Sequence, residues 1–184
     1  SLALGSSGVS LLELTRAYGA FANQGLLVEP IFITKIVSRD GTVLEENQPR
    51  LKQAISPQTA YLVTNLLTSV VQEGTGRRAR VLKRPCAGKT GTTNDVRDAW
   101  FIGYTPDIIA GTWVGFDNQK PLGKNETGAV AASPIWVEFM QGVLEGRPKK
   151  TFPVPDGVVF MRVDLETGKP ATSQSKKVSY ECFK

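Results

Sequence analysis

The chain has 184 residues, of which 41% are hydrophobic and 21% charged, a balance that is typical of a globular protein and excludes wholesale disorder. It contains no histidine, which excludes Ser-His-Asp and Cys-His catalysis and zinc sites of the HExxH type. The formal net charge of +5 is a mild basic excess that suits anionic cell-surface polymers, lipid headgroups or nucleic acid equally well.

The first quarter of the chain predicts a helix followed by a β-hairpin. Ser10 is a favourable helix cap, and apolar residues recur after it at three- and four-residue spacings up to Gly25. β-Branched residues over 31–37 predict a strand, an Asp-Gly turn over 39–42 ends it, and Val43 begins a return strand.

The middle of the chain adds a second helix, three strands and a third helix. Ser56 and Pro57 begin the second helix, which should end by Gly74. Three apolar segments then follow closely enough to form an antiparallel meander, over residues 87–92, 99–104 and 108–116. Pro134 begins the third helix. The predicted fold class is α+β, an antiparallel sheet flanked by helices.

The chain is expected to divide near residue 150. Residues 1–150 carry the helices and the sheet, whereas residues 151–184 predict an extended C-terminal tail. Within the tail we expect one short hairpin, a strand over 160–163 with its return around 164–168.

The cysteine content argues against a zinc site, and the start of the chain shows no signal peptide or membrane anchor. Cys86 and Cys182 are too few for a four-ligand zinc site, and two separate thiols are expected rather than a disulfide. No apolar run reaches the ~18 residues that a membrane helix needs, and the first residues suggest an interior loop rather than a signal peptide. We therefore expect any signal or anchor of the parent protein to precede Ser1.

The segment 86–95 carries the main chemical motif. Its Gly-Lys-Thr sequence matches the end of a phosphate-binding P-loop, but that motif requires a glycine where Lys83 stands. Pro85 would also interrupt the flexible loop, and no strand–loop–helix frame surrounds it. The P-loop interpretation is therefore rejected.

Lys89, Thr90 and Gly91 fit instead the Lys-Thr-Gly strand of serine acyl-transferring enzymes. An edge strand of this kind can pair with an extended peptide substrate. Lys89 and the Thr90 hydroxyl would then hold a substrate carboxylate, Gly91 would let substrate approach, and the Thr92 backbone N–H would form one arm of an oxyanion hole. The tripeptide alone recurs by chance, so an ordinary strand with an exposed lysine stays open.

Longer segments around this motif resemble the transpeptidase domain of class A, or bifunctional, penicillin-binding proteins. The resemblance is collinear over about residues 1–165. It is carried by residues 2–9, 13–23, 73–77, 87–107, 113–118 and 132–136. It implies the fold shared by penicillin-binding proteins and serine β-lactamases, present only in part, with 87–92 as the active-site strand. It also places the basic Gly-Thr-Gly-Arg loop near that strand. Two interpretations of the loop therefore stay open, a role on the substrate side and an ordinary solvated loop.

The family implies two further motifs, Ser-x-x-Lys for the nucleophile and base and Ser-x-Asn for proton relay. No Ser-x-Asn occurs in the chain. One Ser-x-x-Lys match exists at Ser173–Lys176, but it lies in a polar stretch without helical periodicity and follows the other motif, so we reject it. Both missing motifs are expected upstream of Ser1.

By resemblance, the parent is a peptidoglycan D,D-transpeptidase in which an active serine attacks a D-Ala–D-Ala stem peptide and passes the acyl group to an amine on a neighbouring peptide. β-Lactams would mimic the donor. This chain would supply Lys89, Thr90, Gly91 and the Thr92 N–H, would need the upstream half of the protein, and would be inactive alone. Neither a metal, a cofactor nor nucleic acid is expected.

The resemblance also implies a bacterial parent that is anchored in the cytoplasmic membrane and faces the periplasm. Two alternatives stay open. One is a D,D-carboxypeptidase or serine β-lactamase on the same scaffold, with water as acceptor, and the other is a non-catalytic scaffolding module of the envelope. The main interpretation requires the Lys89 amine to point from a sheet edge into a groove that can hold a peptide carboxylate.

Overall fold

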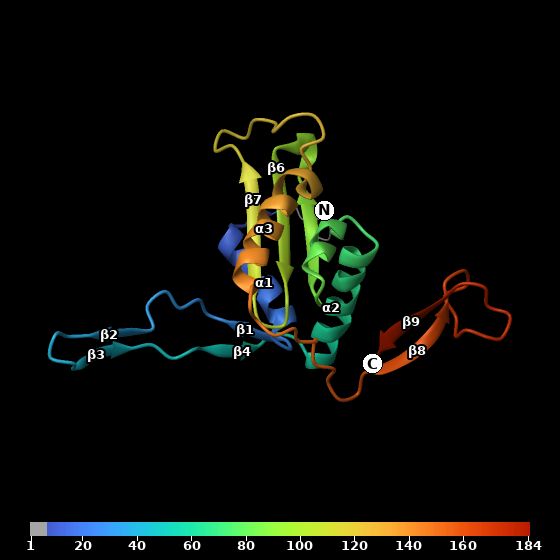
Figure 1. Cartoon of the computed structure of the whole chain (residues 1–184), viewed down its shortest axis with the longest axis horizontal. Helices are drawn as coiled ribbons and strands as arrows, with labels where there is room; N and C mark the ends of the chain where they lie inside the picture. The colour runs from blue at the N-terminus through green and yellow to red at the C-terminus, as the bar shows by residue number, and fades with distance from the viewer. Residues whose placement is uncertain (1–6) are drawn as a thin grey trace.

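A central body with two outlying hairpins makes up the computed structural model, which describes residues 7–184 (Figure 1). The body is built on an antiparallel sheet of β5 (Ala87–Thr92), β6 (Asp98–Tyr104) and β7 (Ile109–Gly115), with β6 in the middle. The register is regular, so that Thr92 lies opposite Ala99 and Trp100 opposite Trp113. The predicted meander is therefore confirmed.

Helices cover both faces of this sheet. On one face α1 (Leu11–Ala22) packs against β7, and α2 (Pro57–Gln72) packs against β5. On the other face lies α3 (Ser133–Leu144), which continues from the π-helical turn η4 (Gly128–Ala132). Because successive strand residues face opposite sides, Tyr104 packs towards α1 and α2 whereas Phe101 packs towards α3.

The helix starts follow from the capping residues that the sequence predicts. The Ser10 hydroxyl accepts the N–H of Glu13 at 3.2 Å, while the Glu13 carboxylate accepts the N–H of Ser10 at 2.8 Å, which completes a capping box. Ser56 caps α2, and Pro57 occupies its first turn. No helix among residues 7–184 is both long and apolar enough to cross a membrane.

The largest buried cluster lies between the sheet and α3. Phe101 and Trp136 are fully buried and meet in an edge-to-face arrangement with ring centroids 4.9 Å apart. The Trp136 indole N–H donates to the Ala110 carbonyl at 3.0 Å, so the ring is fixed to β7 as well. Cys86 and Met140 are among the other fully buried members of the cluster.

A long hairpin, which joins α1 to α2 in the sequence, projects sideways from the body (Figure 1). Its base pairs β1 (Leu26–Val28) with β4 (Leu51–Gln53), and its far end pairs β2 (Lys35–Val37) with β3 (Val43–Glu46). The predicted turn is confirmed, but the predicted strand over 31–37 begins only at Lys35. Strands β1 and β4 were not predicted, because three residues are too few to show alternation.

The tail forms a second hairpin, of β8 (Val159–Asp164) and β9 (Val178–Phe183). The predicted turn at 164–168 is confirmed, since the Asp164 N–H donates to the Lys169 carbonyl at 2.9 Å and Val163 forms an antiparallel bridge with Pro170, but the strand that pairs along β8 is a later one. The Asp164 carboxylate accepts the N–H groups of Glu166 and Thr167 at 2.8 and 3.2 Å and makes a turn there, and the return strand starts ten residues later. This hairpin lies against α2, where the Tyr61 and Phe160 rings are 6.2 Å apart.

Candidate active site

Strand β5 forms one edge of the three-stranded sheet, since it pairs with β6 and with no other strand among residues 7–184. Just beyond it, the Thr93 N–H donates to the Asp98 carbonyl at 3.1 Å. Because hydrogen-bonded pairs alternate along an antiparallel ladder, the backbone groups of Lys89 and Gly91 then face β6. Those of Thr90 and Thr92 face away from β6, at the edge of the sheet.

Lys89 is the first exposed residue of β5, after the buried Ala87 and Gly88. Its ammonium group donates to the Thr90 carbonyl at 2.8 Å, so the cation lies over the edge of the sheet rather than turning away from it. The strand thus presents a cation, an outward carbonyl and outward N–H groups within a few residues.

Neither of two well-formed pockets among residues 7–184 lies beside Lys89, where a groove is expected. The larger well-formed pocket, of about 350 Å³, lies between α1 and the turn joining β6 to β7, and Arg16 and Pro106 are among its lining residues. A smaller one lies beside Tyr61 and Phe152. Neither includes a residue of β5, so the groove expected at this edge stays a prediction.

Thr90 is half-buried, and its hydroxyl lies 2.6 Å from the hydroxyl of Thr75. Thr75 belongs to the glycine-rich loop between α2 and the 3-10 helix η2 (Arg77–Leu82). The interpretation of this basic segment as an ordinary solvated loop is only partly correct. The arginines of η2 are exposed, but Ala79 is fully buried and fixes η2 to the core.

Thr92 and Gly91 are supported from the side of η4. The Gly128 N–H donates to the Thr92 hydroxyl at 3.0 Å, and a side chain at Gly128 would collide with the carbonyls of Gly91 and Trp100. Gly91 itself leaves little room, because a Cβ there would lie 3.1 Å from the Cβ of Trp100. The Thr92 side chain is therefore held from the side of η4, while its N–H remains at the edge.

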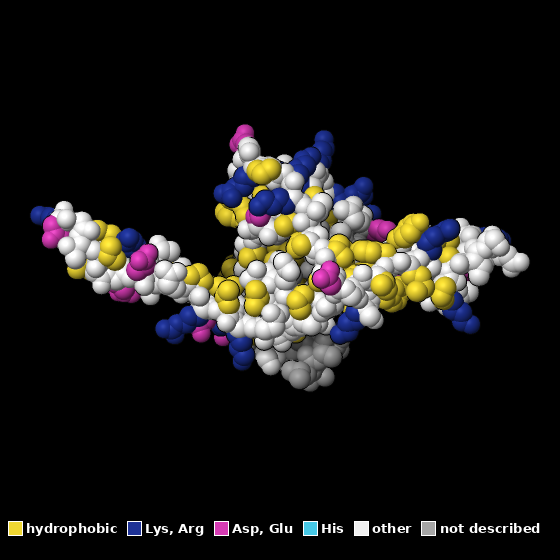
Figure 2. Space-filling model, turned by 90° about the horizontal axis from the view of Figure 1, so that it is seen from below, with side chains coloured by type: hydrophobic (Ala, Val, Ile, Leu, Met, Phe, Trp, Pro, Cys, Tyr) yellow, Lys and Arg dark blue, Asp and Glu magenta, His cyan; other side chains and the backbone are white. Residues whose placement is uncertain are grey.

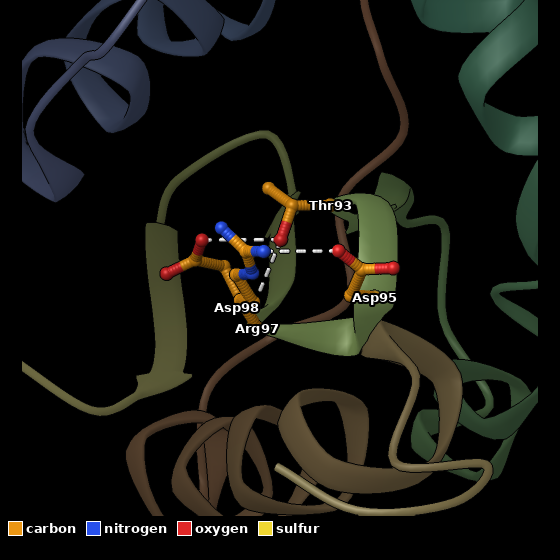
Figure 3. A network of polar contacts seen from close by, with 4 residues as sticks. All are labelled: Thr93, Asp95, Arg97 and Asp98. Atoms are coloured by element: carbon orange, nitrogen blue, oxygen red, sulfur yellow. Dashed lines mark hydrogen bonds and ion pairs between the residues drawn. The ribbon is translucent and has the colours of Figure 1, made fainter. Parts of the chain in front are cut away.

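A polar network closes the turn that follows β5 (Figure 3). The Asp98 N–H donates to the Thr93 hydroxyl at 2.9 Å, and that hydroxyl lies 3.1 Å from the Asp98 carboxylate. The Trp113 indole N–H donates to the other carboxylate oxygen at 2.8 Å. Arg97 pairs with Asp95 rather than with the neighbouring Asp98, at 3.0 Å.

Other predicted features lie away from this edge. Ser173 sits in a turn of the loop between β8 and β9, not on a buried helix, which agrees with its rejection as a nucleophile. The two cysteines are free thiols, as expected. Within residues 7–184, no three His, Cys, Asp or Glu side chains are grouped so that they could hold a metal ion.

Comparison with known proteins identifies the family. The family model described as the penicillin binding protein transpeptidase domain matches residues 1–141, so the chain belongs to that family. Penicillin-binding protein 1A of Aquifex aeolicus is 45% identical over 164 residues, which cover 89% of this chain and 23% of that protein. The chain thus spans about a quarter of the length of the curated relatives that it matches, 23% and 29% in two cases.

Solved structures place the fold in the same family. Penicillin-binding protein 1A from Haemophilus influenzae gives a TM-score of 0.90 at 29% identity, covering 98% of this chain and 33% of that one. Penicillin-binding protein 3 from Mycobacterium tuberculosis, complexed with aztreonam, gives a TM-score of 0.59 at 30% identity over 78% of this chain and 37% of that one. The predicted α+β transpeptidase fold is confirmed.

Proposed function

We propose that this chain supplies the substrate-binding edge strand of a peptidoglycan D,D-transpeptidase that works by serine acyl transfer. The observation that carries the proposal is the edge of β5, where the backbone groups of Thr90 and Thr92 face outward beside the Lys89 ammonium group. An extended peptide could pair with these groups as an added strand.

The proposed roles follow from the chemistry of each group. Lys89 supplies positive charge for the terminal carboxylate of a D-Ala–D-Ala donor, and the Thr90 hydroxyl donates to the same carboxylate. The Thr92 N–H stabilises the oxyanion that forms when the serine attacks. Gly91 lets β5 lie close to Trp100 of β6, because a Cβ there would be 3.1 Å from the Cβ of Trp100. The serine and its base belong, in this proposal, to residues before Ser1.

The substrates and ligands are proposed from the family. The donor is a D-Ala–D-Ala stem peptide, the acceptor is an amine of a neighbouring stem peptide, and β-lactams occupy the donor site. Support for the last point comes from the aztreonam complex of the Mycobacterium tuberculosis relative, since aztreonam is a β-lactam. The parent protein is proposed to be membrane-anchored with this domain on the periplasmic side.

The test uses the full-length protein and a fluorescent penicillin. Wild-type protein should be labelled, and replacing the upstream serine with alanine should abolish labelling. Lys89→Ala should lower the rate of labelling by about 100-fold, the scale seen when one preorganised electrostatic group is removed. Lys52→Ala is the matched control, because Lys52 is also an exposed strand lysine and lies outside β5. A folded wild-type protein that stays unlabelled would favour the scaffolding alternative.

Product analysis separates the activities that share this scaffold. With a stem-peptide substrate and an amine acceptor, a transpeptidase releases D-alanine and forms a cross-linked product. A D,D-carboxypeptidase releases D-alanine and leaves only the trimmed peptide, because water is its acceptor. Cross-linked product from the wild type is expected, and D-alanine release with trimmed peptide alone would favour the hydrolytic alternative.

The proposed division of the chain is at residue 150, with 1–150 as the C-terminal part of the transpeptidase domain and 151–184 as an appended tail. The match of the family model to residues 1–141 supports it. Contacts also cross the boundary, since the Phe152 and Tyr104 rings lie 5.7 Å apart. Limited proteolysis should cut within the tail first, and an initial cut inside β5–β7 would contradict this division.

A further inference from the structure

We propose that Thr75 is a positioning residue whose hydroxyl donates its proton to Thr90 and thereby directs the Thr90 proton to the carboxylate of a bound substrate or penicillin. The inference rests on the proposed function of β5. It assigns a role to the glycine-rich loop after α2, which contributes no residue to the Lys-Thr-Gly strand itself.

The geometry requires the two hydroxyls to share one proton. Thr75 Oγ1 and Thr90 Oγ1 lie 2.6 Å apart, a short hydrogen bond between hydroxyl groups. Each hydroxyl has one proton to donate and two lone pairs that accept. Only one of the two protons can lie between the oxygens, so one threonine donates to its partner and the other keeps its proton for a different acceptor.

A carboxylate ligand selects one of these two arrangements. If Thr90 donates to Thr75, Thr90 presents only lone pairs to an incoming carboxylate, which itself can only accept. If Thr75 donates to Thr90, the Thr90 proton is free to bind the carboxylate in a charge-assisted hydrogen bond. The two bonds then run in one direction, Thr75 to Thr90 to carboxylate, and each polarises the next.

The loop is built so that Thr75 stays in place beside β5. The N–H groups of Gly74 and Gly76 both donate to the Val70 carbonyl, at 3.0 and 3.1 Å, which folds the loop back on the end of α2. Gly76 is buried, and the 3-10 helix that follows is fixed by the buried Ala79. Thr75 is exposed between these two fixed points, with its hydroxyl directed at Thr90.

The test measures how well the full-length protein distinguishes a penicillin with a free carboxylate from its methyl ester. The rate constant of acylation is measured for both compounds, and the ratio of acid to ester is compared among variants. Thr75→Val keeps the shape of the side chain but cannot donate, so the ratio should fall about tenfold, through slower reaction with the acid. Thr75→Ser keeps the hydroxyl and should stay within about twofold of wild type.

Thr68→Val is the matched control, because the Thr68 hydroxyl donates to the Thr64 carbonyl within α2, at 2.9 Å. Its ratio should equal that of wild type. If Thr75→Val fails to fold, Thr75→Ala carries the same comparison. An unchanged ratio in the folded variant, or an equal loss with acid and ester, overturns the inference alone. Wild-type protein that no penicillin acylates overturns the proposed function and this inference with it.

Discussion

The central sheet and the hairpin of residues 26–53 have similar strand-forming sequences but opposite surroundings. Phe101 of β6 is fully buried, whereas Phe32 of the hairpin is 84% exposed. Both regions carry β-branched and aromatic residues, so strand propensity does not decide which side chains leave water. The difference comes from the helices, since α1, α2 and α3 pack against the sheet, whereas the outer strands β2 and β3 of the hairpin are wholly exposed.

In side-chain burial, the C-terminal hairpin is intermediate between the central sheet and the hairpin of residues 26–53. It rests on α2 through Phe160, yet Tyr180 remains 71% exposed. Hydrophobic side chains are visible on the surface of both hairpins (Figure 2). The apolar surface that stabilises the chain is therefore concentrated in the body, which also carries β5, and this contrast can be tested by mutation.

The largest expected effect separates the two phenylalanines. Phe101→Ala should lower the free energy of unfolding by about 3–5 kcal/mol, because it removes a ring packed on Trp136 and leaves a cavity. Phe32→Ala should change it by less than ~0.5 kcal/mol, as is usual for exposed positions. Urea denaturation followed by far-ultraviolet circular dichroism measures both. Comparable losses would mean that the hairpin is as well packed as the sheet.

A second pair of variants tests how tightly the sheet meets α3. A Cβ at Gly103 would lie 2.6 Å from Trp136 and 2.9 Å from the Phe101 ring, so Gly103→Ala should destabilise the protein by about 1–3 kcal/mol through overpacking. Gly142, on α3, has no atom within 4 Å of its would-be Cβ. Gly142→Ala should instead stabilise the helix, by about 0.5–1 kcal/mol. A neutral Gly103→Ala would show that Trp136 can move away from the sheet.

The elements of the body could be predicted from sequence because their signals are local. Ser10 and Ser56 begin their helices by capping, and the closely spaced apolar segments over 87–116 predicted the three strands to within one residue. The strands β1 and β4 pair residues far apart in sequence, such as Leu26 with Gln53, and periodicity in one segment carries no sign of its distant partner.

The candidate site also combines features that the sequence predicts locally with features that depend on distant partners. The Lys-Thr-Gly sequence indicated its chemistry, but the direction of each backbone group depends on the register of β5 with β6. The contact of Thr75 with Thr90 arises because the loop after α2 folds back, and the bond from Trp113 to Asp98 joins the neighbouring strands β7 and β6. The family resemblance placed the loop near β5, but which side chains meet follows from tertiary packing and was not predicted.

A further comparison concerns the two thiols, one in each kind of region. Cys86 is fully buried beside β5, and burial raises the pKa of its thiol to about 11. Cys182 of β9 is only partly buried, although burial also raises its pKa. Because the thiolate is the reactive form, Cys182 should react with a thiol reagent in the native protein at pH 8, and Cys86 only after unfolding.

The pH dependence of the free energy of unfolding tests whether Cys86 is as deeply buried as this contrast requires. Above its ordinary pKa of 9.0 the Cys86 thiol ionises in the unfolded chain, whereas in the folded protein it keeps its proton until about pH 11. The unfolded state therefore binds fewer protons in this range, and stability falls as the pH rises from 9 to 11. Lysines titrate there too, so wild type is compared with Cys86→Ala, in which the lysines are the same. The stability of wild type relative to the variant should fall by about 1–2 kcal/mol across the range. A constant difference would mean that the Cys86 thiol reaches water in the folded protein.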